Sequence, residues 1–201
     1  MAALSEPGHP VLMATPLVQR GSGRRGQILA VAAELFAKHG YHGVSIADLG
    51  AAVGVSGPAL YRHFEGKEAL LAEMLIGISE HLLAGGQERA AVGGGPQEVL
   101  VALVEFQADF ALREPELIVV QDRDLANLPA GARHQVRQLQ RRYVEIWVDT
   151  LSKLHPGLSD EAARVAAHGA FGLLNSTPHT GRGPEAVTLL RRMALAALLE
   201  L

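Results

Sequence analysis

The stretch from Ser45 to Phe64, SIADLGAAVGVSGPALYRHF, decides the fold of the N-terminal part of this 201-residue chain. It contains two short apolar segments of helical period, which are joined by Gly54 and Val55. Ser45 begins the first segment, and Asp48 follows three residues later, which is the spacing of a capping box. Glycine then interrupts the helical pattern before the second segment starts. The stretch therefore predicts a helix-turn-helix.

The second segment predicts a helix over 56–64 with two different faces. Ser56 is expected to be its N-cap, and Pro58 lies in the first turn, where no intrahelical N–H is needed. Leu60 and Phe64 are four residues apart and are expected to point inward, which leaves Tyr61 near the outer face. A helix N-terminus with small residues can approach DNA phosphates and base edges closely. This pattern favours contact with nucleic acid.

The rest of the chain is also predicted to be helical. Residues 1–22 contain prolines and glycines without periodicity, which is typical of a flexible arm. A helix is expected from Arg24 to Gly40, and a longer one from Lys67 towards Leu83, before the Gly85-Gly86 pair. Five further helices are predicted at about 96–112, 115–127, 130–154, 160–175 and 184–200. No sustained period of two occurs, so the fold class is all-α.

Composition and charge exclude several classes of protein. The chain is 48% hydrophobic and 19% charged and has no cysteine, which excludes a disulfide framework and thiolate metal sites. Its net charge of -3 is uneven: residues 20–68 hold six basic and four acidic residues (+2), and the remainder holds 12 and 17 (-5). No apolar run approaches the roughly 18 residues of a membrane span, and MAALSEPGHP does not resemble a signal peptide. We expect a cytoplasmic protein without membrane contact.

Two short matches to enzyme motifs lack the required context. Residues 21–26, GSGRRG, fit a dinucleotide-binding fingerprint, but no strand precedes them. Residues 54–57 come close to a nucleophile elbow, but Pro58 replaces the final glycine and a helix precedes them. The histidines have no metal-binding spacing. We expect no catalytic residue, no metal and no cofactor.

The stretch from Leu29 to Leu75 closely resembles the N-terminal DNA-binding region of TetR-type transcriptional regulators. The resemblance rests on coupled positions: Ala33, Leu35, Phe36, Gly40, Tyr41, Ser45, Ile46, Ala52 to Ser56, Leu60, Tyr61, His63, Phe64, Lys67 and Glu68. It implies a three-helix DNA-binding head (23–68) and a helical ligand-binding and dimerisation domain (69–201). The implied function is a homodimeric, ligand-responsive repressor of palindromic operator DNA. A helical small-molecule-binding module without operator-specific DNA binding remains the alternative.

The resemblance also implies DNA-contacting residues. Together with the basic residues before the first helix, they are Arg24, Arg25, Ser45, Ser56, Gly57, Pro58, Ala59, Tyr61, Arg62, His63 and Lys67. Tyr61, His63 and Lys67 match positions that usually touch phosphate. Gly57 and Ala59, which match base-contacting positions, have no hydrogen-bonding side chain, so base reading is expected to rest on Tyr61, Arg62, apolar contacts and DNA shape. The alternatives without DNA contact are a core position for Tyr61, a capping role for His63 and a solvated arm for the arginines before the first helix.

The C-terminal part predicts a ligand pocket and a dimer interface. Aromatic residues are scarce there, so Tyr143 and Trp147, on one face of helix 130–154, are expected to line the pocket with Phe106, Phe110 and Arg123. Core packing is the alternative for the aromatic residues, and a solvated face is the alternative for the run around Arg123. Family members that regulate lipid metabolism suggest a hydrophobic or amphipathic effector, such as an acyl-CoA or fatty acid. Apolar faces on 160–175 and 184–200 are expected to form the dimer interface, and the helix from Lys67 to Leu83 is expected to transmit the signal.

Overall fold

The computed structural model describes residues 23–180 and 183–201, and within these ranges every regular element is a helix. The elements are α1 (Arg24–His39), α2 (Ile46–Ala52), α3 (Gly57–Leu60), α4 (Lys67–Ala91), α5 (Pro96–Arg113), α6 (Pro115–Asp124), the 3-10 helix η2 (Leu125–Asn127), α7 (Ala130–Leu154), α8 (Asp160–Leu174), α9 (Thr177–Thr180) and α10 (Pro184–Leu199). The predicted all-α fold class is confirmed. The expected arm, 1–22, lies outside the described residues.

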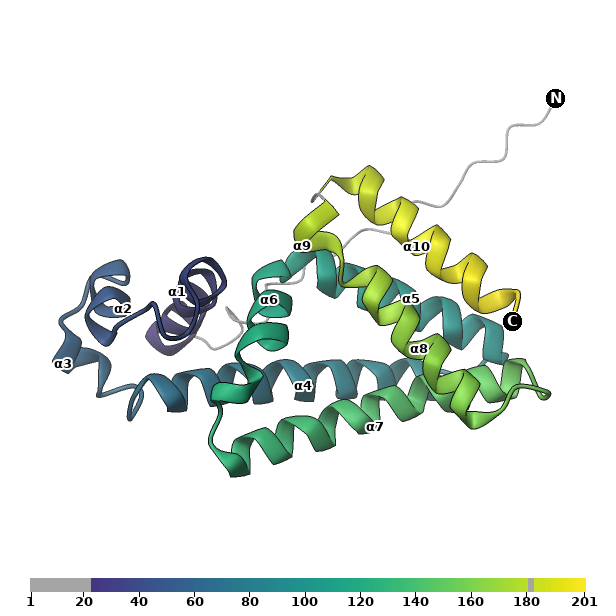
Figure 1. Cartoon of the computed structure of the whole chain (residues 1–201), viewed down its shortest axis with the longest axis horizontal. Coiled ribbons are helices and arrows are strands. Elements are labelled where there is room, and N and C mark those ends of the chain that lie inside the picture. Colours follow the sequence, from purple (N-terminus) through teal and green to yellow (C-terminus); the bar gives the residue numbers. More distant parts are fainter. Residues whose placement is uncertain (1–22, 181–182) are drawn as a thin grey trace.

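Helix α4 joins the two parts of the molecule (Figure 1). Helices α1 to α3 form a small head at its N-terminal end, and the rest of α4 runs beside α7 in a helical body that also contains α5, α8 and α10. Helix α6 lies between the head and the body and packs against α1. The apolar core continues through both parts, from Phe36 and Leu60 in the head to Trp147 in the body.

The expected end of the fourth helix near Leu83 is wrong, because α4 continues to Ala91 through Gly85 and Gly86. Both glycines are buried where a ring from another helix approaches the α4 backbone. A Cβ atom on Gly85 would lie 2.2 Å from Cζ of Phe106, and one on Gly86 would lie 2.7 Å from Cε2 of Tyr143. Close packing therefore outweighs the low helix propensity of glycine at these two positions.

By length and composition alone, α4 is also apolar enough to cross a membrane, which inspection of the sequence missed. More than half of its most apolar stretch is buried inside the molecule. The buried side chains include Leu70, Leu71, Leu75 and Leu82, which belong to the core shared with the other helices. These contacts make α4 the central core helix of the body.

The remaining predicted boundaries agree with the structure to within a few residues, with two exceptions. The segment expected as one helix over 115–127 divides into α6 and η2, and the helix expected over 56–64 is α-helical only over Gly57–Leu60. Beyond Leu60 the chain tightens, because the amide of His63 donates to the carbonyl of Leu60 at 2.9 Å. This i to i+3 bond is typical of a helix end that turns into a 3-10 conformation.

The close approach at Gly86 predicts opposite effects for two substitutions in α4. Gly86→Ala should lower the free energy of unfolding by about 1–3 kcal/mol, because the new methyl group overlaps the buried ring of Tyr143. Gly77→Ala is the matched control, since nothing lies near its Cβ position and it should raise that free energy by up to about 1 kcal/mol. Chemical denaturation measures both values. Equal stabilisation by both variants would contradict the packing at Gly86.

Candidate DNA interface and ligand cavity

The first helix of the helix-turn-helix begins with the predicted capping box. Oγ of Ser45 accepts a hydrogen bond from the amide of Asp48 at 3.1 Å, and Oδ2 of Asp48 accepts one from the amide of Ser45 at 2.8 Å. Hydrogen bonds from the side chain and backbone of Ser45 hold the pKa of the Asp48 carboxyl below its usual value. Ser45 is therefore committed to starting α2, and the charge of Asp48 lies at the positive end of that helix.

The link between α2 and α3 is a tight turn that needs glycine. Gly54 has a φ of 70°, a backbone conformation that side chains with a Cβ rarely adopt. The amide of Val55 donates to the carbonyl of Gly50 at 2.8 Å and closes the turn. This turn sets the direction of α3 relative to α2, and hence which residues the head presents to solvent.

Helix α3 has the two faces that the sequence predicts. Leu60 and the following Phe64 are buried in the head core, while the Tyr61 side chain is 55% exposed and Arg62 is exposed beside it. Pro58 lies in the first turn as expected. Ser56 is the N-cap as expected, although its side chain makes no capping hydrogen bond. The outer surface of α3 is formed by small, aromatic and basic residues.

Three basic residues that were expected to contact DNA are held by the protein itself. Arg24 donates to the carbonyl of Val53 at 2.7 Å. The guanidinium of Arg25 forms an ion pair with Glu73, donates to the carbonyl of His63 and lies 4.2 Å from the centre of the Phe64 ring. These contacts tie α1 to the helix-turn-helix and to α4.

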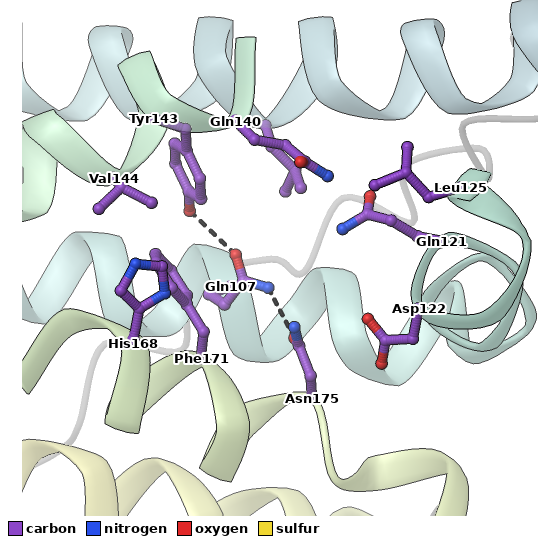
Figure 2. A pocket seen from close by; sticks show the side chains of 11 residues that line it. Gln107, Gln121, Asp122, Leu125, Gln140, Tyr143, Val144, His168, Phe171 and Asn175 are labelled. Atoms are coloured by element: carbon purple, nitrogen blue, oxygen red, sulfur yellow. Dashed lines mark hydrogen bonds between the residues drawn. The ribbon is translucent and has the colours of Figure 1, made fainter. Parts of the chain in front are cut away.

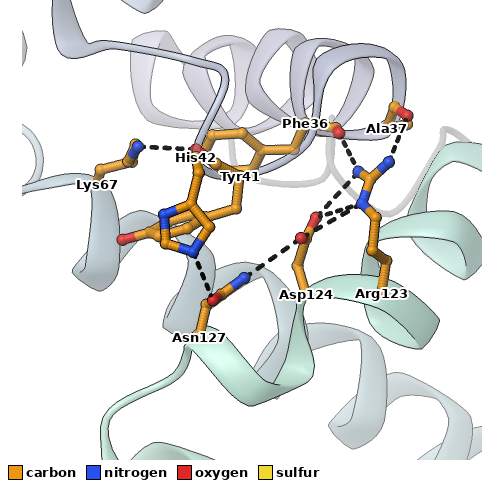
Figure 3. A network of polar contacts seen from close by, with 8 residues as sticks. All are labelled: Phe36, Ala37, Tyr41, His42, Lys67, Arg123, Asp124 and Asn127. Atoms are coloured by element: carbon orange, nitrogen blue, oxygen red, sulfur yellow. Dashed lines mark hydrogen bonds and ion pairs between the residues drawn. The ribbon is translucent and has the colours of Figure 1, made fainter.

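Lys67 is the third basic residue that was expected to contact DNA and is held by the protein itself. Its ammonium group donates to the carbonyls of Tyr41 at 2.7 Å and Val44 at 2.8 Å, and it lies 4.3 Å from the centre of the Tyr41 ring (Figure 3). Lys67 therefore stabilises the loop between α1 and α2 in this arrangement. The half-buried His63 has its carbonyl bound by Arg25, and Gly57 and Ala59 lie half-buried along α3. Among the described basic residues expected at DNA, Arg62 keeps a free guanidinium.

A cavity of about 350 Å³ lies in the body, between α4, α5, α6, η2, α7 and α8 (Figure 2). Its walls combine apolar side chains with amides, a carboxylate and an imidazole. The lining residues are Leu82, Gln107, Gln121, Asp122, Leu125, Gln140, Tyr143, Val144, His168, Phe171 and Asn175. A cavity of this size with a few convergent polar groups is typical of a small-molecule site.

A chain of hydrogen bonds fixes one wall of the cavity. The hydroxyl of Tyr143 donates to Oε1 of Gln107 at 3.0 Å, and Nε2 of Gln107 donates to Oδ1 of Asn175 at 2.8 Å. Burial raises the pKa of the Tyr143 hydroxyl, so this group stays protonated and remains the donor. Three helices, α5, α7 and the end of α8, are thereby linked beside the cavity.

Only one of the five residues expected at the pocket, Tyr143, lines this cavity. Phe106 packs instead near His81 and under the guanidinium of Arg89, which lies 3.9 Å from its ring centre. Phe110 is buried in the core, and Trp147 is fully buried behind Phe171, with 4.8 Å between their ring centres. The aromatic residues selected from the sequence belong mostly to the core next to the cavity. The lining itself is marked by polar residues that lie within otherwise apolar helices.

Arg123, the fifth expected residue, points away from the cavity and holds the head (Figure 3). Its guanidinium donates to the carbonyls of Phe36 and of Ala37, the latter at 3.2 Å, near the C-terminal end of α1. The same guanidinium pairs with Asp124 at 3.0 Å, and the carboxylate of Asp124 is buried. A cation from another helix thus binds the carbonyl of Ala37 at this helix end and adds to the bond that the carbonyl of Phe36 accepts from the amide of Gly40.

Asn127 extends this contact to the loop after α1. Its amide donates to Oδ1 of Asp124 at 3.3 Å, and its Oδ1 lies 2.9 Å from Nε2 of His42. We call Arg123, Asp124 and Asn127 the head clamp. Asp122 and Leu125, which lie beside the clamp residues in sequence, line the cavity. One short segment, α6 with η2, therefore contacts the cavity with one face and the head with the other.

Two family models match the chain in the same order as its two parts. Residues 28–74 match the model described as bacterial regulatory proteins, tetR family, and residues 93–182 match the model described as a tetracyclin repressor-like C-terminal domain. A curated relative, the HTH-type transcriptional repressor KstR2 of Rhodococcus jostii (strain RHA1), is 28% identical over 159 residues, which cover 78% of this chain and 76% of that protein.

Solved structures have the same fold. A TetR-family transcriptional regulator from Bordetella parapertussis 12822 superposes with a TM-score of 0.81 at 26% identity, over 88% of this chain and 94% of that one. AibR, whose structure was solved in complex with isovaleryl coenzyme A and operator DNA, superposes with a TM-score of 0.75 at 21% identity, over 88% of this chain and 98% of that one.

The head clamp predicts a local effect of Arg123→Ala. Without the guanidinium, the buried Asp124 has no cation. The carbonyl of Ala37 loses this donor, and the carbonyl of Phe36 keeps only the amide of Gly40. Hydrogen exchange should therefore become at least several-fold faster at the end of α1 and in the loop that holds His42. Arg137→Ala, which alters an exposed arginine on α7, is the control and should leave this exchange unchanged. Unchanged exchange in both variants would contradict the clamp.

Proposed function

We propose, because the chain belongs to the TetR family of bacterial regulatory proteins, that it is a cytoplasmic transcriptional repressor. It binds palindromic operator DNA as a homodimer through its helix-turn-helix heads. A small amphipathic molecule in the body cavity releases it from DNA. The observation that carries this proposal is the double contact of α6 and η2, which line the cavity and hold the head.

The DNA contacts are proposed for the outer face of α3. The exposed hydroxyl of Tyr61 and the free guanidinium of Arg62 are placed to reach phosphates or base edges in the major groove. Gly57, Pro58 and Ala59 keep the start of α3 narrow, and the hydroxyl of Ser56 is not used as a cap. Arg24, Arg25, Ser45, His63 and Lys67 act mainly by holding this face in position, through the contacts described above.

The homodimer is proposed to form through α8 and α10, as family membership implies. Both helices carry large apolar side chains that a single chain leaves exposed: Val165 at 67%, Leu189 at 54% and Met193 at 47%. Gly169 and Gly172 lie on the exposed side of α8 and have open space beyond their backbone, which permits a close approach by another helix. Apolar surfaces of this kind commonly mark contacts between copies of a chain.

Release from DNA requires that the effector bind one arrangement of the heads better than the other. A molecule in the cavity touches Asp122 and Leu125, and any displacement of this segment moves the head clamp at the end of α1. Helix α4, first expected to transmit the signal, provides a second connection, because Leu82 lines the cavity and the same helix begins at Lys67 beside the head. Two helices thus connect the cavity to the head.

The effector is proposed to be amphipathic, in keeping with the mixed lining. An acyl-CoA or a fatty acid was the expected class, and the solved complex of AibR contains isovaleryl coenzyme A. These ligands carry phosphates or a carboxylate, whereas the residues that line this cavity include no lysine or arginine. The lining therefore supports the apolar part of this expectation and favours a different polar group.

The DNA proposal predicts that Arg62→Ala and Tyr61→Phe weaken binding to the DNA immediately upstream of the chain's own gene. Arg62→Ala should lower affinity about tenfold and reduce the slope of log affinity against log salt by about one, because one phosphate is then without its cation. Tyr61→Phe should lower affinity less and leave the slope nearly unchanged, since only a neutral hydroxyl is removed. Fluorescence anisotropy at several salt concentrations measures both quantities.

Arg137→Ala is the control, because it removes the same charge from the body and leaves α3 intact. If the double variant of Tyr61 and Arg62 kept full affinity and an unchanged salt slope, the proposed docking face would be wrong. If the unaltered protein bound this DNA no better than random DNA, the alternative, a helical small-molecule-binding module without operator-specific binding, would replace the proposal.

A further inference from the structure

We infer that the body cavity binds a cationic amphiphile, a small primary amine on an apolar body, with its ammonium group beside Asp122. This inference deepens the proposed function, and it rests on that proposal only for the cavity being the effector site. It concerns the polar group of the effector, and it replaces the anionic group of the acyl-CoA or fatty acid that was first expected. The charged groups that face the cavity are the first observation that supports the inference.

The cavity wall has one carboxylate and no strongly basic side chain. Among the lining residues, Asp122 is the acid, His168 is the titratable base, and there is no lysine or arginine. Within the described part of the chain, the Asp122 carboxylate has no hydrogen bond or ion pair, and its electrostatic neighbour is His179 on α9. The residue as a whole is exposed, but desolvation of its carboxyl group raises its pKa, with His179 acting in the opposite direction. A partly desolvated carboxylate without a partner attracts a cation and repels an anion.

Asp122 differs in this respect from its neighbour Asp124. Asp124 faces the head and is paired with Arg123 and Asn127, so its charge is already satisfied. Two residues earlier in the chain, Asp122 faces the cavity instead (Figure 2). The guanidinium that could have neutralised the cavity is therefore committed to the head clamp. This division leaves a negative group on the cavity wall.

Two amides on the cavity wall have side chains that are available to a ligand. Gln121 and Gln140 line the cavity, and their side chains make no hydrogen bond within the described part of the chain. An ammonium group has three donors, so it can donate to an amide oxygen as well as to the carboxylate, and Gln121 is the nearer of the two amides to Asp122 in Figure 2. Gln107 is less available, because Tyr143 and Asn175 already use its carbonyl and its amino group. Of the free amides, Gln121 therefore lies on the side of Asp122.

The opposite side of the cavity suits an apolar body. The rings of Tyr143 and Phe171 are stacked, with 5.6 Å between their centres, and Val144 lies on the same side. Leu82 and Leu125 add further apolar lining to the cavity. Burial of an alkyl or ring system here gains the usual hydrophobic free energy. The polar and apolar sides together define an amphipathic ligand with a positively charged end.

The test compares four probes that share an eight-carbon chain: octylamine, octanol, octanoate and octanoyl-CoA. Trp147 is the only tryptophan of the chain, and its ring contacts Phe171 on the cavity wall, so its fluorescence reports occupancy. We expect octylamine to bind roughly tenfold or more tightly than octanol, since a hydrogen bond to a charged group adds that much affinity. Octanoate should bind weakest. Tighter binding of octanoate or octanoyl-CoA than of octylamine would overturn the inference.

The matched variant is Asp122→Asn, which keeps the shape of the side chain and removes its charge. It should weaken octylamine binding about tenfold and leave octanol binding unchanged. Asp149→Asn, the same substitution at an exposed site on α7 outside the cavity, should change neither. Thermal melting verifies that both variants fold. An unchanged affinity of Asp122→Asn for octylamine would also overturn the inference.

Release of DNA is measured separately, so that the two proposals can fail independently. Octylamine should displace the unaltered protein from its upstream DNA at concentrations that saturate the Trp147 signal, and Asp122→Asn should require about tenfold more. If octylamine fills the cavity as expected but no specific DNA complex forms, the proposed function fails and the cavity chemistry stands. If DNA binds specifically but octylamine leaves Trp147 unchanged, the inference fails and the proposed function stands.

Discussion

The position of the head depends on the guanidinium of Arg123, which closes the C-terminal end of α1. Two backbone carbonyls of α1 and the buried carboxylate of Asp124 share this one cation. A buried carboxylate without its cation is costly, so the joint between head and body has a preferred arrangement rather than a range of equivalent ones. Because the neighbouring residues of the same segment line the cavity, the proposed function requires that the energy of this joint change when the cavity is filled.

The helix-turn-helix could be predicted almost completely from local sequence. The capping box of Ser45 and Asp48, the glycine turn at Gly54 and the inward pair of Leu60 and Phe64 involve residues close in the chain, so spacing alone identifies them. The end of α4 could not be predicted in this way, since Gly86 is explained by the ring of Tyr143 from a distant helix. Local propensity and tertiary packing disagree there, and packing decides.

The cavity lies in the part of the chain where the sequence predicted a ligand pocket, but most of its lining residues differ from those predicted. Aromatic side chains were the criterion, and the densest cluster, around Trp147, is core. The role of Arg123 was wrong for a similar reason: a charged run on a short helix gives no sign of which residue faces which neighbour. A cation can also be used internally, as Arg25 and Lys67 are, so the basic excess of the head overstates the charge available to DNA. Few free cations imply few phosphate contacts, which suits the proposed complex, from which a small ligand releases the DNA.

The central claim is that occupancy of the cavity changes the positions of the heads, and an inter-head distance tests it most directly. The chain has no cysteine, so a spin label on Glu34→Cys, at an exposed position of α1, is unique in each protomer. Pulsed electron resonance on the proposed dimer should then give one inter-head distance. We predict that this distance shifts by several ångströms when octylamine saturates the Trp147 signal, and that Arg123→Ala broadens its distribution and reduces the shift. An identical distance distribution with the cavity empty and filled would contradict the account.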